Sequence, residues 1–473
     1  MVILESRLQQ LFKQPWIKKV LEYLDNTSGN KWQITINNIT VKYISNDLKP
    51  NILELLRLHL DEEKDRLETT EILLLDKRKE LLKIKTLIKL VNRCIEYQKQ
   101  HNGKLNKSIK YAIRRSFLID EYGQKICQSF YQQIKGIGIF DGNVNLLFNR
   151  YTSLINIIEI YQQVDTQVSI DFSFYWNNGL MLRSNNLIIF GNSLDKDLGK
   201  LIDEKEDNNL LHQIIKRICI FNYLGNVMTI PSKLSIYWID YKKELMKIKD
   251  DKDRLFTSSE INTGVTNGVE IIITRKEECL KTILHECCHL YDWDFKNIPK
   301  ELNKWFLDTF PITTTLTDYN NEPTLNLFEA YTEWLASILE IIFRYYPEGG
   351  ENKVLNELEK QIIYTSQKCG KILEISNCQS IGHFLKNNTN NKCQIHQSTN
   401  IFSYFVLKLF FYWRCDLLLS CLDEKGSFIK SKNNFNMIRM ITEKCVRSKS
   451  LLYFMMDNNG KGDATISLRM VKT

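Results

Sequence analysis

Hydrophobic and polar residues follow two different periods along this chain. Over 51–100 the apolar residues recur every three or four positions, and the segment contains neither proline nor glycine. This spacing predicts long amphipathic helices, such as a helical hairpin. The chain has only 7 prolines and 19 glycines in 473 residues, fewer than common usage, so tight turns are scarce and helix is expected to dominate.

Short runs with a period of two interrupt the helices. Residues 31–45 alternate around an Asn-Asn pair, and residues 168–190 alternate around Asn-Gly and Asn-Asn pairs. Residues 233–241 have the composition of a strand, and 258–275 contain two extended runs around another Asn-Gly pair. Because these pairs accept the backbone conformations of tight turns, we expect hairpins at 31–45, 168–190 and 258–275.

These elements predict an α+β protein that is rich in helix. The clearest polar, charge-rich break in the first half of the chain is 193–209. We therefore expect an N-terminal region of helices and hairpins of unknown role (1–209) and a central domain with a small twisted sheet (210–345). A helical C-terminal region (346–473) is expected to pack against the central domain.

The segment 276–293 predicts a helix whose buried face is set by its apolar residues. They recur at helical spacing: Leu280, Ile283, Leu284, Cys287, Cys288 and Tyr291. His285, Glu286 and His289 fall on the arc that points away from this face. The two cysteines lie on the apolar arc, so we interpret them as small core residues and not as metal ligands.

His285, Glu286 and His289 form an H-E-x-x-H motif. Two imidazoles one helical turn apart can bind one Zn²⁺, and the glutamate between them can reach a water on the metal. Zinc lowers the pKa of that water toward ~7, so Glu286 can act as general base while the water attacks a carbonyl. The motif predicts amide hydrolysis. The alternative is a solvated polar face of a surface helix.

A third zinc ligand is expected downstream, in the helix predicted over 326–346. Glu329, Glu333 and Glu340 form a narrow acidic stripe on that helix. In the ligand interpretation Glu329 completes a His₂Glu set, and Glu333 accepts a hydrogen bond from a ligating imidazole and fixes its tautomer. The alternative is that the stripe faces water, as glutamates on amphipathic helices commonly do.

A strand, a helix with HECCH and a second helix with Glu-Ala-Tyr-Thr-Glu together resemble the gluzincin metallopeptidases, above all anthrax lethal factor and its relatives. The matching stretches are HECCHLYDW and NLFEAYTEWLASIL, and the resemblance covers 233–345. It implies a zincin-like central domain made of a small sheet, an active-site helix and a glutamate helix. The implied roles are zinc ligands His285, His289 and Glu329, general base Glu286, and supporting carboxylate Glu333.

The resemblance also implies a sheet edge that pairs with the substrate. The strand expected there consists of Val269, Glu270, Ile271, Ile272, Ile273 and Thr274. In this family a tyrosine or histidine usually stabilises the oxyanion, and the nearest loop candidate is Tyr319. The alternative for Tyr319 is ordinary loop packing.

The 12 cysteines are scattered without paired spacing, which is typical of buried free thiols in a reducing, cytoplasm-like compartment. One group lies within 28 residues: Cys369, Cys378, His383, Cys393 and His396. Its spacing is irregular and contains no C-x-x-C pair, so scattered thiols are a better interpretation than a second, structural zinc site.

Charge and hydropathy narrow the class of partner. The 64 Lys and Arg exceed the 56 Asp and Glu by +8, without a dense basic tract, so no nucleic-acid partner is expected. The longest apolar stretch, 401–413, is shorter than the ~20 residues of a membrane span and contains Lys408. No secretory signal is visible, and the frequent Lys, Asn and Ile indicate an AT-rich genome such as that of a large DNA virus.

The predicted function is that of a zinc-dependent metalloendopeptidase with one catalytic zinc ion and a protein or peptide substrate. The flanking regions are expected to select the substrate. The alternative is a catalytically inactive, zincin-derived structural or interaction protein that keeps zinc as part of its fold. A third class, nucleic-acid binding, is disfavoured by the diffuse charge.

Overall fold

The computed structural model describes these residues: 2–27, 37–45, 51–69, 75–101, 105–118, 120–135, 154–176, 180–202, 210–225, 233–240, 243–246, 254–257, 261–378, 393–457, 465–467 and 469–470. Within them the protein is rich in helix and contains a mixed sheet, which confirms the α+β prediction at that level. No described helix combines the length and the apolar character needed to cross a membrane.

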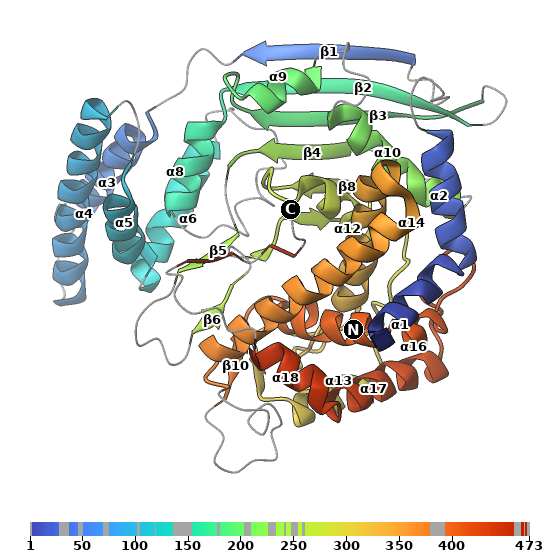
Figure 1. The fold of residues 1–473 in the computed structure, drawn as a ribbon. Helices are drawn as coiled ribbons and strands as arrows, with labels where there is room; N and C mark the ends of the chain where they lie inside the picture. The colour runs from blue at the N-terminus through green and yellow to red at the C-terminus, as the bar shows by residue number, and fades with distance from the viewer. Residues whose placement is uncertain are drawn as a thin grey trace.

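The main sheet has six strands in the described residues, in the order β1-β2-β3-β4-β8-β7 (Figure 1). Their bounds are β1 Asn37–Ser45, β2 Thr166–Trp176, β3 Leu180–Gly191, β4 Lys233–Trp238, β7 Gly264–Thr266 and β8 Glu270–Ile273. β1, β2 and β3 are antiparallel, β4 and β8 run parallel to β3, and β7 is antiparallel to β8.

Two of the predicted hairpins are confirmed and one is wrong. β2 pairs with β3, and β7 pairs with β8 across a turn in which Gly268 has φ 90°. The Asn-Asn pair within 31–45 instead lies in β1, which pairs with β2. The Asn-Asn pair within 168–190 lies inside β3, where Asn186 Nδ2 donates to Ser169 Oγ (3.1 Å) and Asp171 Oδ1 (2.5 Å). Long-range strand pairing thus overrides the local turn preference of asparagine.

The predicted edge strand, Val269–Thr274, is not an edge. β8 covers most of it and lies between β4 and β7, so both of its sides are hydrogen-bonded within the sheet. Val269 belongs to the preceding turn and is 61% exposed, and Ile271, Ile272 and Ile273 are buried. Among the residues that the structure describes, the outermost strand at this side of the sheet is β7.

The two faces of the sheet are covered by different helices because alternate strand residues point to opposite sides. Leu187 and Ile189 of β3 join the core formed with α10 (Leu210–Gly225), α12 (Cys279–Leu290) and α14 (Phe328–Ile375). Ile188 and Phe190 join a second core. Its helices are α3 Ile52–Glu68, α4 Leu75–Gln100, α5 Lys107–Leu118, α6 Glu121–Lys135 and α8 Leu154–Gln163.

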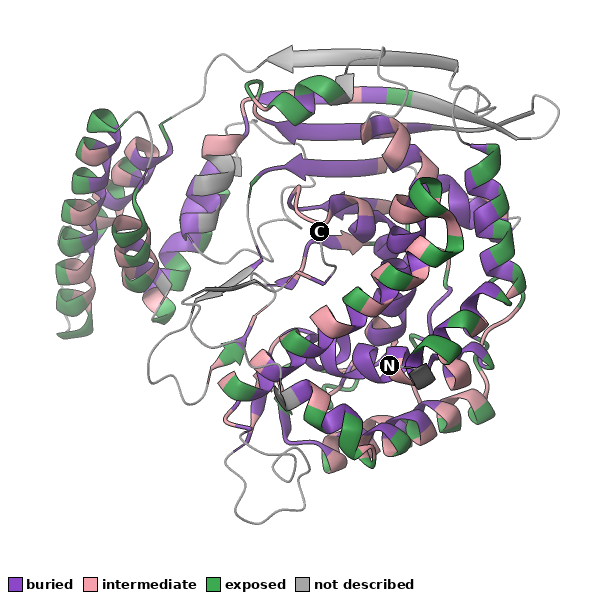
Figure 2. Ribbon diagram, in the orientation of Figure 1, coloured by how far each residue is buried: buried purple, intermediate pink, exposed green. Residues whose placement is uncertain are grey.

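The remaining helices are α1 Val2–Phe12, α2 Pro15–Asn26, α9 Lys196–Ile202, α13 Lys300–Thr309, the π-helix η3 Phe402–Leu407, α15 Lys408–Trp413, α16 Cys415–Leu419, α17 Lys432–Val446 and α18 Lys449–Asp457. A parallel sheet joins β6 (Leu255–Phe256), β10 (Ile395–Gln397) and β9 (Ile312–Thr314). A further pair joins β5 (Glu244–Met246) to β11 (Thr465–Ser467). Figure 2 shows β4 and α12 almost wholly buried, whereas α4 and α17 alternate between buried and exposed residues.

Elements of the fold continue across both predicted domain boundaries. β3 and β4 lie on opposite sides of position 209 and are neighbours in one sheet. α14 runs across position 345, and its helical geometry breaks only at Gly349 and Gly350. Gly350 has φ 64° and ψ −160°, a conformation open almost only to glycine. Residues from all three predicted regions share the core that holds α12 and α14.

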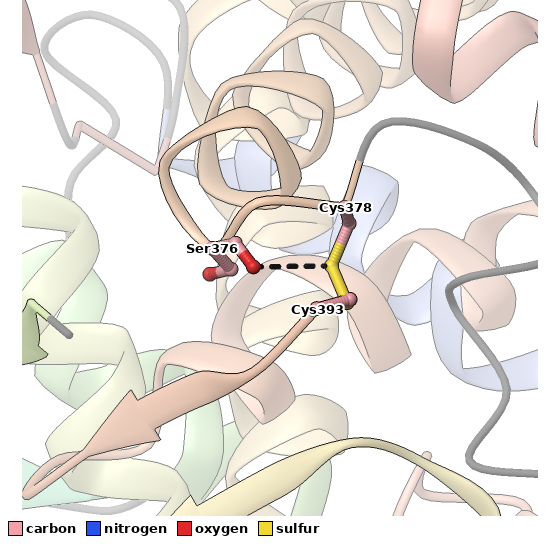
Figure 3. The surroundings of a disulfide bond; sticks show 3 residues. All are labelled: Ser376, Cys378 and Cys393. Atoms are coloured by element: carbon pink, nitrogen blue, oxygen red, sulfur yellow. Dashed lines mark hydrogen bonds between the residues drawn. A yellow bond between two sulfur atoms is a disulfide. The ribbon is translucent and has the colours of Figure 1, made fainter. Parts of the chain in front are cut away.

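The prediction that all cysteines are free thiols is wrong for two of them. Cys378 and Cys393 form a disulfide, with Cα atoms 4.5 Å apart and the Ser376 carbonyl beside the Cys378 sulfur (Figure 3). The sequence gives no sign of this pair because the end of α14 and the approach to β10 meet only in the fold. The other ten cysteines are buried thiols, as expected. Because Cys378 and Cys393 are joined in the disulfide, neither can act as a thiolate ligand in the possible second zinc site, whose His383 lies outside the described residues.

A buried ion pair ties α10 to α14. Arg217 Nε donates to Glu340 Oε2 at 2.7 Å, and both side chains are 2% exposed. Glu340 belongs to the acidic stripe predicted from the sequence, but it binds Arg217 and Arg344 and so serves the packing of the helices.

We expect Arg217→Met to lower the free energy of unfolding by about 3–5 kcal/mol, because it leaves the Glu340 carboxylate buried without its strongest partner. Arg66→Met, which breaks the exposed pair with Glu63, is the control and should change stability by less than about 1 kcal/mol. Urea denaturation of both variants measures the difference. Equal stability of the two variants would show that Arg217 is not needed to compensate the buried charge.

Candidate metal centre

Two helices from different parts of the chain bring three metal-ligating side chains together. His285 and His289 lie one turn apart on α12, and Glu329 lies in the first turn of α14. The two Nε2 atoms are 3.1 Å apart, and Glu329 Oε2 lies 3.1 Å from His285 Nε2 and 3.3 Å from His289 Nε2. Ligands bound tetrahedrally at ~2.0–2.1 Å are about 3.3 Å from one another. The three donor atoms thus have the spacing that one metal ion requires.

A carboxylate behind each imidazole fixes which ring nitrogen carries the proton. His285 Nδ1 lies 3.0 Å from Glu333 Oε2, and His289 Nδ1 contacts Asp294 Oδ2. Since an ionised carboxylate only accepts hydrogen bonds, we assign the ring proton to Nδ1 in both neutral imidazoles. Both Nε2 lone pairs then face Glu329 Oε2, a buried atom without a hydrogen-bond partner among the described residues. Such lone pairs repel one another unless a cation lies between them, so the residues fit a metal ion.

Asp294 owes its position to the way α12 ends. Asp292 adopts the left-handed conformation (φ 57°). Its N–H donates to the carbonyl of His289 (3.2 Å), and the N–H of Trp293 donates to the carbonyl of Cys288 (3.0 Å), which is a Schellman motif. The motif turns the chain back, so that the buried carboxylate of Asp294 reaches His289. Sequence reasoning missed Asp294 because no helical spacing relates this loop residue to the histidine that it contacts.

Glu333 lies at the centre of a buried ionic cluster. Lys281 Nζ donates to both of its oxygens, at 2.9 and 2.8 Å, and Lys408 Nζ lies 3.6 Å from Oε1. These three side chains are between 0 and 4% exposed. Lys243 and Glu278 form a second buried pair at 2.7 Å. The sequence analysis did not predict a role for these lysines. Lys408, for example, lies in the apolar stretch that forms η3 and α15 and is buried with it.

The carboxylates around the histidines favour positive charge at the centre. Burial opposes protonation of His285, but hydrogen bonds with Glu329 and Glu333 outweigh burial and raise its pKa. Burial likewise opposes protonation of His289, but the charge of Glu329 and the hydrogen bond with Asp294 raise its pKa to about 10. Burial alone would raise the pKa of Glu329, yet the two imidazoles hold it below its usual value. Without a metal ion, the site therefore retains protons that an ion would displace.

Glu286 lies on α12 between the two histidines and faces β7. A Cβ atom at Gly264 of β7 would lie 2.7 Å from Glu286 Oε1 and 2.6 Å from Thr282 Cγ2, so a larger residue would displace one of these side chains. His285, Glu286, Gly264 and Tyr404 help to line a pocket with about 20 Å³ of free space, which is enough for about one water molecule. A carboxylate in this position can exchange a proton with that water.

The structure brings Tyr404 to this pocket and leaves Tyr319 outside it. Tyr319 is 90% exposed on a loop and does not line the pocket. Tyr404 lies in the π-helix η3, with its ring centroid 6.0 Å from that of His285. Asn400 Nδ2 donates to Glu329 Oε1 at 3.3 Å, just before this helix. Burial and the nearby charge of Glu329 raise the pKa of Tyr404 well above its usual value, so its hydroxyl stays protonated and can donate a hydrogen bond.

Metal binding should release protons and tighten as the pH rises. The metal-free His289 is protonated below its pKa of about 10, whereas a bound imidazole must be neutral, so binding at pH 8 should release about one to two protons. Calorimetric titration with Zn²⁺ in buffers of different ionisation enthalpy counts these protons. His101→Ala, which changes an exposed histidine at the end of α4, should release as many as the unmodified protein. Binding without proton release would contradict the raised pKa of His289.

Together these residues can hold a divalent cation, accept a proton from a neighbouring water and donate a hydrogen bond to an oxygen atom. The metal donors come from α12 and α14, and the proton acceptor from α12. Comparison with protein-family models, curated proteins and solved structures finds no match to this chain.

Proposed function

We propose that this protein is a zinc-dependent metallopeptidase that hydrolyses peptide bonds. The observation that carries the proposal is that three donor atoms lie within 3.3 Å of one another, beside Glu286 and a pocket for one water. Two imidazoles and one carboxylate form a donor set typical of catalytic zinc, because three protein ligands leave the fourth position open. The H-E-x-x-H helix and the later glutamate helix, which resemble those of gluzincins, favour a zincin-like core.

In this mechanism each side chain has one task. Bound zinc supplies the Lewis acidity that activates water and polarises a carbonyl group. Glu286 accepts a proton from the water in the pocket and later passes it to the leaving amine. Glu333 and Asp294 hold the Nδ1 protons of the imidazoles, which keeps both Nε2 atoms aimed at one point. β7 lies beside Glu286, so that its Gly264 closes one side of the carboxyl group.

Tyr404 takes the role that the sequence suggested for Tyr319. Its protonated hydroxyl belongs to a side chain that lines the same pocket as Glu286 and His285. A phenol in this place can donate a hydrogen bond to the oxygen that becomes negative when water attacks the carbonyl. Such a donor stabilises the transition state more than the bound substrate.

The general base is tested with Glu286→Gln. The amide keeps the shape of the side chain but cannot accept the proton, so turnover of a mixed peptide library should fall by about 10²–10⁴-fold. The zinc content, measured by atomic absorption, should not change. Glu301→Gln, an exposed change on α13, is the matched control and should cleave as fast as the unmodified protein. Equal cleavage by Glu286→Gln would refute the assigned base, and zinc binding without any cleavage would favour the inactive alternative.

The role of Tyr404 is tested with Tyr404→Phe. Removing the hydroxyl should lower kcat by about 10²–10³-fold and change KM little, because the hydrogen bond forms mainly in the transition state. Tyr111→Phe, an exposed tyrosine on α5, serves as the control. If Tyr319→Phe lowers kcat and Tyr404→Phe does not, the assignment to Tyr404 is wrong.

A further inference from the structure

The last described residues of the chain return to the interior, next to the candidate metal centre. Residues 465–467 and 469–470, which we call the tail segment, follow α18. Thr465–Ser467 forms β11, which pairs with β5 (Figure 1). Met470 is only 3% exposed and belongs to the main hydrophobic core.

Side chains from three helical elements hold both backbone groups of Met470. Its N–H donates to Glu278 Oε1 at 2.7 Å, at the start of α12. Its carbonyl accepts from Gln361 Nε2 of α14 at 2.6 Å and from Lys408 Nζ of α15 at 3.1 Å. The preceding Arg469 donates to Glu277. The protein thus binds the backbone N–H and C=O groups of Met470 in the way that a peptide-binding site binds the backbone of its ligand.

Met470 is also a wall of the pocket that contains the proposed general base. Glu286, His285 and Tyr404 line this pocket together with Lys281 and Met470. The Met470 sulfur lies 3.8 Å from Lys281 Nζ. With Met470 in place, about 20 Å³ remains, which holds about one water molecule but no peptide residue. Glu286, which lines this pocket, is only 4% exposed.

We propose that the tail segment closes the candidate active site from within, and that a peptide substrate must displace Met470 to reach Glu286. The inference rests on the peptidase function proposed above. Apart from Lys243, which precedes β5, the other walls belong to α12, α14, η3 and the segment around β7, which the sheet and the main core hold in place. A substrate residue that takes the place of Met470 meets Glu278 as acceptor and Gln361 and Lys408 as donors, in a space shaped for an unbranched apolar side chain.

The test compares the zinc-loaded full chain with three variants. Met470→Ala removes the side chain that fills the pocket, and Arg469→Ala removes a partly exposed anchor of the tail segment without changing the core. Met455→Ala deletes an equally large buried side chain in α18 that does not line the pocket, and it is the matched control. Two rates are measured: zinc transfer to an excess of a chromogenic chelator, and hydrolysis of a mixed peptide library. Circular dichroism confirms that each variant is folded.

We expect Met470→Ala to speed zinc transfer and hydrolysis by about tenfold, since it raises the fraction of open molecules, and Arg469→Ala to act in the same direction. Met455→Ala should change neither rate. Faster zinc transfer without hydrolysis in any of the proteins supports the closure and refutes the peptidase. Unchanged zinc transfer in both tail variants overturns the closure, as does an equal acceleration by Met455→Ala. Loss of hydrolysis in folded Met470→Ala also overturns it, because Met470 would then help to bind substrate.

Discussion

The mutual repulsion of three lone pairs governs the centre of this structure. His285, His289 and Glu329 turn two Nε2 atoms and one Oε2 atom toward one point, at distances of 3.1 to 3.3 Å. Such an arrangement persists only if other contacts hold each donor and if positive charge lies between them. The hydrogen bonds behind the imidazoles supply the first condition, and protons or a metal ion supply the second. The packing of α12 against α14 sets the distance at which both conditions are met.

The buried lysines extend this constraint beyond the three donor residues. A buried carboxylate is costly unless it is paired, and Glu333 is paired with Lys281 and Lys408 as well as with His285. The charge that orients one imidazole is therefore compensated by side chains from α12 and α15. Lys408 also binds the backbone of Met470, so the tail segment contacts the same cluster. Ligand geometry, helix packing and the position of the tail segment thus depend on one set of interactions.

Local periodicity predicted the part of the site that lies on helices. The spacing of α12 placed Glu286 on the same arc as the histidines, although this arc is buried and not exposed to solvent. Periodicity could not find Asp294, which reaches His289 through a reversed turn, or Tyr404, which arrives from 75 residues beyond Glu329 by long-range packing. The order of the strands in the sheet could not be predicted for the same reason. Alternation of apolar and polar residues identifies β7 and β8 as strands, but their neighbours depend on the pairing of the whole sheet.

Because residue 264 is a glycine, the backbone of β7 can approach Glu286 closely. Because the backbone of β7 lies directly against the carboxyl group, Glu286 has little room for other rotamers. The conformational entropy of this side chain is thus given up when the chain folds and need not be lost later, in the proton transfer that we propose for it. A glutamate on the exposed face of a helix would have to lose this entropy each time a substrate binds. Here a single glycine in the neighbouring strand keeps the carboxyl group pre-oriented.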